Sequence, residues 1–368
     1  MFSSDAIDRM TPTIPKMPVF DGHNDTLVAL HLPGDEAPRS FFERSDRGHI
    51  DLPRALEGGF AGGLFGICVP PTPDMHSFLG SGPPPSDAGY DVPLPPPLDH
   101  AYAKDMTVAV MADLFRLETE SGGRMKVVRT AREMQTCVED GFIAAVLHFE
   151  GAEAIDDGLD ALHAFYAAGL RSLGIVWSRP NAFATGVPFR FPGSPDTGSG
   201  LSDAGRELVR ACNELGIMLD LAHLNERGFW DVAALSDAPL AVTHAAAHAL
   251  CPSTRNLTDK QLDAVGASGG VVGVAFHVGN LRADGRQDTD TPLSDIVRHV
   301  DYVARRIGID HVAFGSDFDG AIMPRELGDV AGLPRLVEAM RMNGFEEPDL
   351  RKVTHENWLR LLERTWKS

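Results

Sequence analysis

Cysteines are few in this sequence, and none of them form a close pair. Cys68, Cys137, Cys212 and Cys251 are far apart, and no C-x-x-C motif is present. Two disulfides could be made from this number. A chain of 368 residues can build a core without them, however, so we predict four buried free thiols.

Long apolar runs are also missing. None reaches the roughly 18 residues that a membrane-spanning helix needs. The first ten residues, MFSSDAIDRM, lack the basic segment and apolar core of a signal peptide. We therefore expect neither a signal peptide nor a transmembrane helix, no membrane partner, and a cytoplasmic location.

Basic residues are scarce relative to acidic ones. The chain has 33 Lys and Arg against 52 Asp and Glu, for a net charge of −19. Nucleic acids and anionic membrane surfaces are bound by basic patches, so this balance argues against both as partners. The expected partner is a small-molecule substrate, and the sequence is compatible with a homodimer.

Eight apolar runs of strand length recur along the chain, with helix-like stretches between them. The runs are 17–23, 62–69, 142–149, 172–177, 217–222, 240–243, 271–276 and 311–315. The clearest helix-like stretches are 101–120, 158–168, 202–215, 258–268 and 293–307. Buried strands that alternate with helices in this number are typical of an α/β fold of the (β/α)8 TIM-barrel type. A doubly wound sheet could use the same strands, but no glycine-rich phosphate turn follows the first run, so we favour the barrel.

Two segments interrupt the repeat. Residues 70–98 are rich in proline and are not expected to form regular structure, whereas residues 180–200 are rich in Gly, Pro and Ser. We interpret both as long loops on the catalytic rim. The first either shapes a lid or is a disordered surface insertion. No linker is evident, so residues 1–368 are predicted to form a single barrel domain with long rim loops near 70–100 and 180–200. A helix over 347–366 is expected to close the barrel.

Ionisable residues follow five of the eight apolar runs, where barrel enzymes place their catalytic groups. They are His23 and Asp25, Glu150, Asp220 and His223, His244, and Asp317 and Asp319. One such residue alone is commonly structural. Burying so many without compensation would cost several kcal/mol each, and a metal centre would neutralise them.

The number of candidate ligands suggests two ions. One zinc usually takes three protein ligands and a water, whereas three imidazoles and two carboxylates are present here. The set is His23, Asp25, Glu150, His223 and His244. It serves two divalent ions if Glu150 bridges them, and ions about 3.5–4 Å apart would share a hydroxide as nucleophile. Asp317 is left over and suits a general base.

These motifs together resemble the membrane (renal) dipeptidase family of zinc metallopeptidases, which is related to the amidohydrolase-type barrels. The matching stretches, in family order, are Asp21-Gly22-His23-Asn24-Asp25, Phe149-Glu150-Gly151, Asp220-Leu221-Ala222-His223, Thr243-His244, Ser253-Thr254-Arg255-Asn256 and Gly315-Ser316-Asp317-Phe318-Asp319-Gly320. They span almost the whole chain.

The resemblance implies a dipeptidase that cleaves a single peptide bond, with L,D-dipeptides among its candidate substrates. It implies one zinc on His23 and Asp25 and a second on His223 and His244, with Glu150 between them. It also implies that Asp317 handles the proton of the attacking hydroxide, and that Arg255 grips the free carboxylate of the dipeptide. The guanidinium fork suits that last role because it pairs two N–H groups with a carboxylate.

One departure from the family stands at 177–181. Better-known members carry a His there that contacts the scissile carbonyl, whereas this chain reads Trp177-Ser178-Arg179-Pro180-Asn181. Zinc alone could polarise the carbonyl, or Arg179 or Asn181 could help. The departure leaves room for a related metallohydrolase that acts on N-acyl amino acids, lactones or phosphoesters. A catalytically inactive barrel used for binding is disfavoured, because every candidate ligand is retained.

Several neighbouring residues have more than one interpretation. His148 shares a face with Glu150 and is either a support for the site or a packed core residue. His277 ends the seventh run and could face the pocket. Asp319 is either a support for the site or a turn residue. Asp21 shares a face with His23, and Gly22 would let the backbone pass close to the metals.

Overall fold

The strands form the predicted parallel barrel in the computed structural model, which describes residues 16–33, 37–71 and 89–367. Each of the eight apolar runs overlaps a strand. These strands are β1 (Val19–Asn24), β2 (Phe60–Ile67), β5 (Ile143–Glu150), β6 (Ser172–Gly174), β8 (Met218–Asp220), β9 (Ala241–Ala245), β10 (Val271–Val274) and β11 (Val312–Phe314). They pair in this order, and a short extra strand, β4 (Met125–Val127), pairs with the start of β5.

The barrel closes between its last and first strands. The N–H of Asp317 donates to the carbonyl of His23 at 3.0 Å, and the N–H of Asp25 donates to the carbonyl of Phe318 at 2.8 Å. An isolated parallel bridge joins Asn24 to Phe318. The contact that closes the barrel therefore joins residues 23–25 to residues 317–318, and it fixes the first and last candidate site segments against each other.

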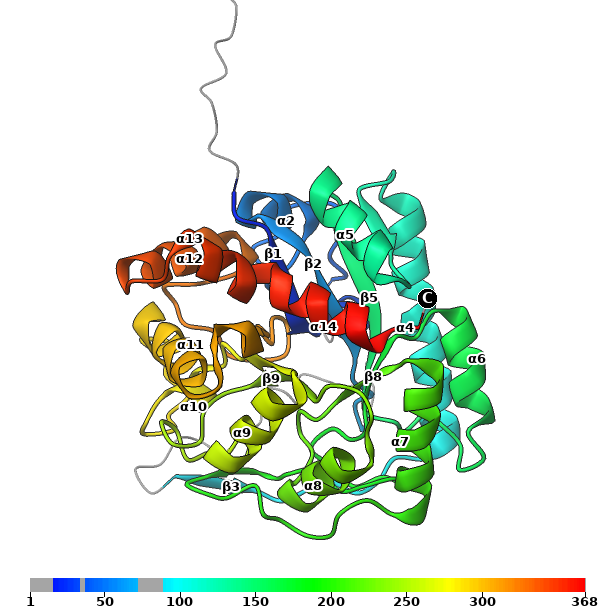
Figure 1. The fold of residues 1–368 in the computed structure, drawn as a ribbon. Coiled ribbons are helices and arrows are strands. Elements are labelled where there is room, and N and C mark those ends of the chain that lie inside the picture. Colours follow the sequence, from blue (N-terminus) through cyan, green and yellow to red (C-terminus); the bar gives the residue numbers. More distant parts are fainter. Residues whose placement is uncertain (1–15, 34–36, 72–88, 368) are drawn as a thin grey trace, which may run out of the picture.

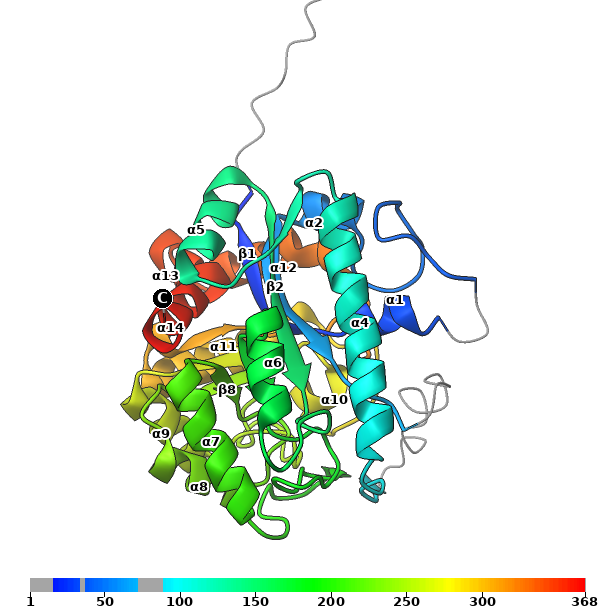
Figure 2. The same cartoon turned by 90° about the vertical axis from the view of Figure 1, so that its right-hand side faces the viewer.

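Helices surround the barrel (Figures 1 and 2). They are α1 (Thr26–His31), α2 (Leu52–Gly58), α4 (His100–Glu120), α5 (Ala131–Asp140), α6 (Asp160–Ala168), α7 (Asp203–Leu215), α8 (Glu226–Leu235), α9 (Asp259–Ser268), α10 (Val278–Leu281), α11 (Leu293–Ile307), α12 (Leu333–Met342), α13 (Glu347–Arg351) and α14 (Asn357–Thr365). The five clearest predictions correspond to α4, α6, α7, α9 and α11. The caps follow from sequence: Ser202 accepts from the N–H of Gly205, and Thr258 and Gln261 form a capping box.

The C-terminal segment covers the end of the barrel where the strands begin. The predicted closing helix is present as α13, a π-helical stretch at Lys352–Glu356, and α14. Figure 1 shows α14 lying across the strands. Its Trp358 is fully buried, and its indole N–H donates to the carbonyl of Phe314 at 2.9 Å.

Gly22 is packed closely on the side where a side chain would start. A Cβ at this position would lie 2.5 Å from the Trp358 ring and 2.6 Å from the carbonyl oxygen of Thr243. The missing side chain therefore makes room for the indole within the barrel, and the expectation that it also brings the backbone close to the metals stays a prediction. The two residues meet only in the folded chain.

The proline-rich segment was expected to lack regular structure, and this was wrong for three residues. Strand β3 (Tyr90–Val92) pairs antiparallel with β7 (Phe189–Phe191), which lies in the second long loop. No proline lies within Tyr90–Val92: the prolines of the segment lie before Gly89 or from Pro93 onward, so the N–H groups of the strand are intact. Residues 72–88 of the first loop lie outside the described residues, so its interpretation as a lid or a disordered insertion stays open.

Candidate metal centre

The predicted ligands meet at the C-terminal ends of the barrel strands. His23 lies in β1, Glu150 ends β5 and His244 lies in β9, so three strands aim their side chains at one point. His223 follows β8 with a φ of 63°, and Asp317 follows β11 with a φ of 65°. Left-handed backbone is unfavourable for residues with a Cβ, and it is found preferentially at functional sites.

Glu150 is at the centre of this group. Its Oε1 lies 3.0 Å from Nε2 of His223, 3.3 Å from Nε2 of His244 and 3.6 Å from Nε2 of His23. Nε2 of His23 is also 3.4 Å from Oδ2 of Asp25. Among the described residues, two sets have ligand atoms close enough for one ion: His23, Glu150 and His244, and His23, Asp25 and Asp317.

Hydroxyl groups fix two of the imidazoles from behind. Oγ of Ser178 lies 2.7 Å from Nδ1 of His223, and Oγ1 of Thr243 lies 2.9 Å from Nδ1 of His244. The Thr243 hydroxyl donates in turn to the buried carboxylate of Asp220 at 2.6 Å. With Nδ1 occupied, each ring presents Nε2 to the centre, as metal-ligating histidines do.

His23 lies at a point of the site where a cation is favoured. The side chain is fully buried, and neither ring nitrogen has a hydrogen-bond partner among the residues that the structure describes. Burial lowers the pKa of His23, but the carboxylates of Glu150 and Asp25 outweigh it and raise the pKa to about 10. A positive charge is thus favoured at this point, and a divalent ion would supply it.

Burial also shifts the pKa values of the other candidate ligands. Burial lowers the pKa of His223 and of His244 well below the usual value, so both rings are neutral, as metal binding requires. Burial raises the pKa of Glu150 well above its usual range and also raises that of Asp25. Two carboxylates buried this closely need cationic charge to stay ionised. The donor set therefore fits a metal centre.

Comparison with known proteins identifies the family. The family described as membrane dipeptidase, peptidase family M19, matches residues 7–367. The chain belongs to this family. The predicted enzyme class, a metal-dependent dipeptidase on an amidohydrolase-like barrel, is thereby confirmed.

Similar proteins of this family include two solved structures and one curated relative. A metallopeptidase from Rhodobacter sphaeroides, described as liganded with a phosphinate mimic of the dipeptide L-Ala-D-Ala, is 51% identical with a TM-score of 0.90, covering 95% of this chain and 100% of its own. A structure described as dipeptidase AC of family M19 is 51% identical with a TM-score of 0.89, covering 96% and 100%. Dipeptidase tcpJ from Claviceps purpurea is 28% identical over 93% of this chain and 76% of its own length.

Arg255 lies beside the centre in this M19 chain. It is buried, and one of its terminal N–H groups donates to the carbonyl of His244 at 3.1 Å. Burial lowers the pKa of the guanidinium, while Asp317 and Glu150 raise it. Asp317 is less buried than the ligands and shares a set with His23 and Asp25. A buried cation and a carboxylate thus flank the same ligand cluster.

At 177–181, where better-known family members carry a His, the side chains of Asn181 and Arg179 are engaged in contacts within the fold. Asn181 is committed to its own loop, because its amide donates to the carbonyl of Ile175 and accepts from the N–H groups of Phe183 and Ala184. Arg179 is fully buried, donates to the carbonyl of Val69 at 2.6 Å and lies 3.4 Å from Glu153. Ser178, which sequence reasoning did not single out, contacts a candidate ligand directly.

Each of the other residues with open interpretations has a hydrogen-bond partner in the fold. Nδ1 of His148 lies 2.8 Å from the hydroxyl of Ser172, and its ring packs edge-on against His23. His277 pairs with Gln287 at 2.7 Å. Asp319 accepts from the hydroxyl of Thr26 and from Arg39. Asp21 accepts from the N–H and the hydroxyl of Ser316 at 2.6 and 2.7 Å, and burial raises its pKa to about 6.

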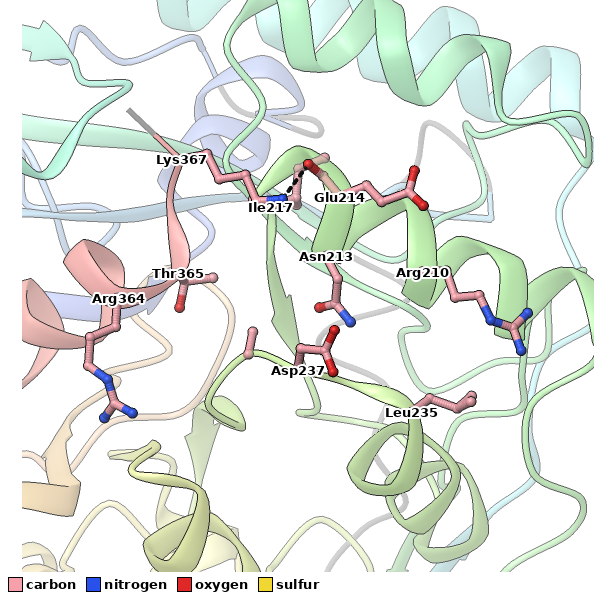
Figure 3. Close-up of a pocket in the computed structure, with 11 residues that line it drawn as sticks. Arg210, Asn213, Glu214, Ile217, Leu235, Asp237, Arg364, Thr365 and Lys367 are labelled. Atoms are coloured by element: carbon pink, nitrogen blue, oxygen red, sulfur yellow. Dashed lines mark hydrogen bonds between the residues drawn. The ribbon is translucent and has the colours of Figure 1, made fainter.

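A pocket lies at the other end of the barrel (Figure 3). Its lining includes Arg210, Asn213, Asp237, Arg364 and Lys367, with Lys367 donating to the carbonyl of Glu214. Ile217 in this lining directly precedes β8, so the pocket faces the strand beginnings. Barrel enzymes do their chemistry at the strand ends, so this hollow is separate from the metal centre.

None of the described helices is both long and apolar enough to pass through a membrane. The four cysteines are buried and free, as predicted.

Proposed function

We propose that this protein hydrolyses the single peptide bond of dipeptides at a centre of two divalent metal ions. The observation that carries this proposal is the convergence of three Nε2 atoms on one Glu150 oxygen, at 3.0–3.6 Å. We infer that His23 and Asp25 hold one ion, that His223 and His244 hold the other, and that Glu150 lies between them. Nitrogen and carboxylate donors suit Zn²⁺, although Mn²⁺ and Co²⁺ accept the same donors.

When bound, the ions would lower the pKa of water and polarise the scissile carbonyl. The chain supplies the rest. Asp317 accepts the proton of the attacking water and delivers it to the leaving amine. Arg255 binds the free carboxylate of the dipeptide with the N–H groups that His244 does not use. This contact would fix the distance from the carboxyl end of the substrate to its scissile bond.

These contacts are made to the terminal carboxylate and the peptide group of the dipeptide, so they constrain its side chains less. L,D-dipeptides are included in the proposal, because the Rhodobacter sphaeroides relative is described with a mimic of L-Ala-D-Ala. We further propose that residues 1–368 act as one barrel domain. A cytoplasmic location without a membrane partner is also proposed, and four buried free thiols suit a reducing compartment.

Two measurements test the function. Elemental analysis of the purified protein is expected to give two equivalents of divalent metal, with zinc predominant. A panel of L,L- and L,D-dipeptides is then assayed beside N-acyl amino acids, lactones and phosphoesters. Turnover restricted to dipeptides supports the proposal. Turnover of N-acyl amino acids alone, or a zinc-supplemented protein that binds far less than two equivalents and stays inactive, contradicts it.

A further inference from the structure

Strands β3 and β7 form a small sheet with two different faces. In the antiparallel register Tyr90 lies opposite Phe191 and Val92 lies opposite Phe189, so these four side chains share one face. The alternate pair, Asp91 and Arg190, lies on the other face. Their side chains are 58% and 43% exposed and form an ion pair at 2.9 Å. One face is therefore apolar and the other meets solvent.

The apolar face is turned toward the metal centre. The ring of Phe189 lies 6.1 Å from the His223 ring and 5.4 Å from the Trp177 ring, measured between centroids. In Figure 1, β3 lies at the end of the barrel opposite to the entry of the chain into β1, which is where the parallel strands end. The sheet therefore covers part of the site.

The same sheet is tied to the segment that carries Arg255. The N–H of Arg190 donates to Oγ1 of Thr254 at 3.2 Å, and the N–H of Thr254 donates to the carbonyl of Arg190 at 3.1 Å. The N–H of Gly193 donates to the carbonyl of Pro252 at 2.7 Å. The sheet and the arginine therefore form one hydrogen-bonded unit.

Tyr90 connects the small sheet to the segment that carries Arg255. Its ring stacks on Phe191 with centroids 6.1 Å apart. The side chain of Ser253 and the charge of Arg255 both act to lower the pKa of the Tyr90 hydroxyl, which places that hydroxyl in their neighbourhood. Ser253 already accepts from the N–H of Arg255 at 3.3 Å, so its single O–H proton is available to Tyr90. Burial raises the pKa of Tyr90 to about 12, so the phenol keeps its own proton at neutral pH.

We propose that Tyr90 is a substrate-binding residue, whose hydroxyl donates a hydrogen bond to the terminal carboxylate that Arg255 grips. This rests on the proposed dipeptidase function. A carboxylate has two oxygens and accepts more hydrogen bonds than one guanidinium edge donates. The hydrogen bonds between the sheet and Thr254 hold Tyr90 and Arg255 in one unit, so the carboxylate would be bound by two donors from different segments. The residue comes from the proline-rich loop, which thereby takes part in substrate recognition.

The test is Tyr90→Phe, which removes only the hydroxyl. We expect KM for a dipeptide such as L-Ala-D-Ala to rise about tenfold, because a hydrogen bond to a charged group is lost. The kcat is expected to stay within about twofold, since the hydroxyl does not reach the reacting atoms. The corresponding dipeptide amide lacks the carboxylate, so kcat/KM for the amide is expected to be the same in variant and wild type.

Two control variants separate this role from a structural one. Asp91→Asn breaks the ion pair on the outer face of the same strand, and Tyr302→Phe removes a hydroxyl that bonds Asp259 far from the site. Both are expected to keep the wild-type KM. An unchanged KM in Tyr90→Phe, an equal loss for acid and amide, or the same loss in Asp91→Asn overturns the inference. Wild-type protein without any dipeptidase activity overturns the proposed function itself.

Discussion

The side chain of Ser178 contacts a candidate metal ligand through a single atom. Its hydroxyl is 2.7 Å from Nδ1 of His223 and is the hydrogen-bond partner that fixes this side of the ring. Loss of such a partner typically weakens metal binding by about 10–100-fold. We therefore expect Ser178→Ala to lower the affinity for zinc within this range, measured by competition with a chelating dye. Ser236→Ala, in a hydroxyl that bonds Asn213 away from the site, is the matched control. Equal affinities in the two variants would show that the hydroxyl does not orient the ring.

Asp317 has two conceivable roles that one variant separates. Its carboxylate lies within ligand distance of His23 and Asp25, and it is also the proposed proton carrier. Asp317→Asn keeps the size but removes the basicity, so kcat is expected to fall about 10²–10⁴-fold. The metal content is expected to remain near two equivalents by elemental analysis. Asp310→Asn, in an exposed carboxylate on the helical side, serves as the control. A parallel loss of metal would instead make Asp317 a ligand.

At the scale of elements, helix α14 bears on stability and not on catalysis. Trp358 fills the barrel where Gly22 and Gly273 leave room, and its removal would open a cavity among buried residues. Trp358→Ala is expected to lower the free energy of unfolding by about 3–5 kcal/mol. Chemical denaturation measures this loss. Trp230→Ala, at a side chain that is 38% exposed, is expected to cost much less. Folded Trp358→Ala protein should keep the wild-type KM, and a raised KM would contradict the separation of the two barrel ends.

The elements also show what sequence alone could predict. The eight strands could be predicted because a parallel strand buried on both faces is apolar throughout. The candidate ligands could be proposed because His or a carboxylate follows five of these runs, where barrel enzymes place their catalytic groups. Strand β3 was missed because its three residues pair with β7, far away in the chain. Ser178 and Thr243 were missed for another reason: hydroxyl residues are common everywhere, and only the folded structure places these two behind an imidazole.

At the scale of the whole molecule, buried neutral histidines make stability depend on pH. His299 on α11 is fully buried. Its Nδ1 accepts from the N–H of Ala247 at 3.0 Å, and its Nε2 donates to the carbonyl of Leu281 at 2.9 Å. This arrangement requires the neutral ring. Burial is the main cause that lowers the pKa of His299 to about 4.

The direction in which pH changes the stability follows from the pKa of His299, which is 6.5 in the unfolded chain and about 4 in the folded protein. Between pH 6.5 and 4 the unfolded chain binds a proton at His299 and the folded protein does not, so stability falls as the pH falls. The full contribution is present above pH 6.5 and amounts to about 3 kcal/mol, at about 1.4 kcal/mol per pKa unit. His223 and His244 act in the same direction in metal-free protein, because burial lowers the pKa of each.

The test is denaturant unfolding of metal-free protein at several pH values from 7 to 4. Burial raises the pKa of Asp21 to about 6, which acts in the opposite direction, so the effect of His299 is measured as the difference in stability between wild type and a His299 variant, which is expected to change as the pH falls below 6.5. His299→Gln is expected to be less stable at pH 7, because the amide fits the two hydrogen bonds less well, but to lose less on acidification. His163→Gln, at an exposed ring, is expected to follow the wild type. If His299→Gln and wild type lost the same free energy between pH 6.5 and 4, the buried imidazole would not be a source of the acid sensitivity.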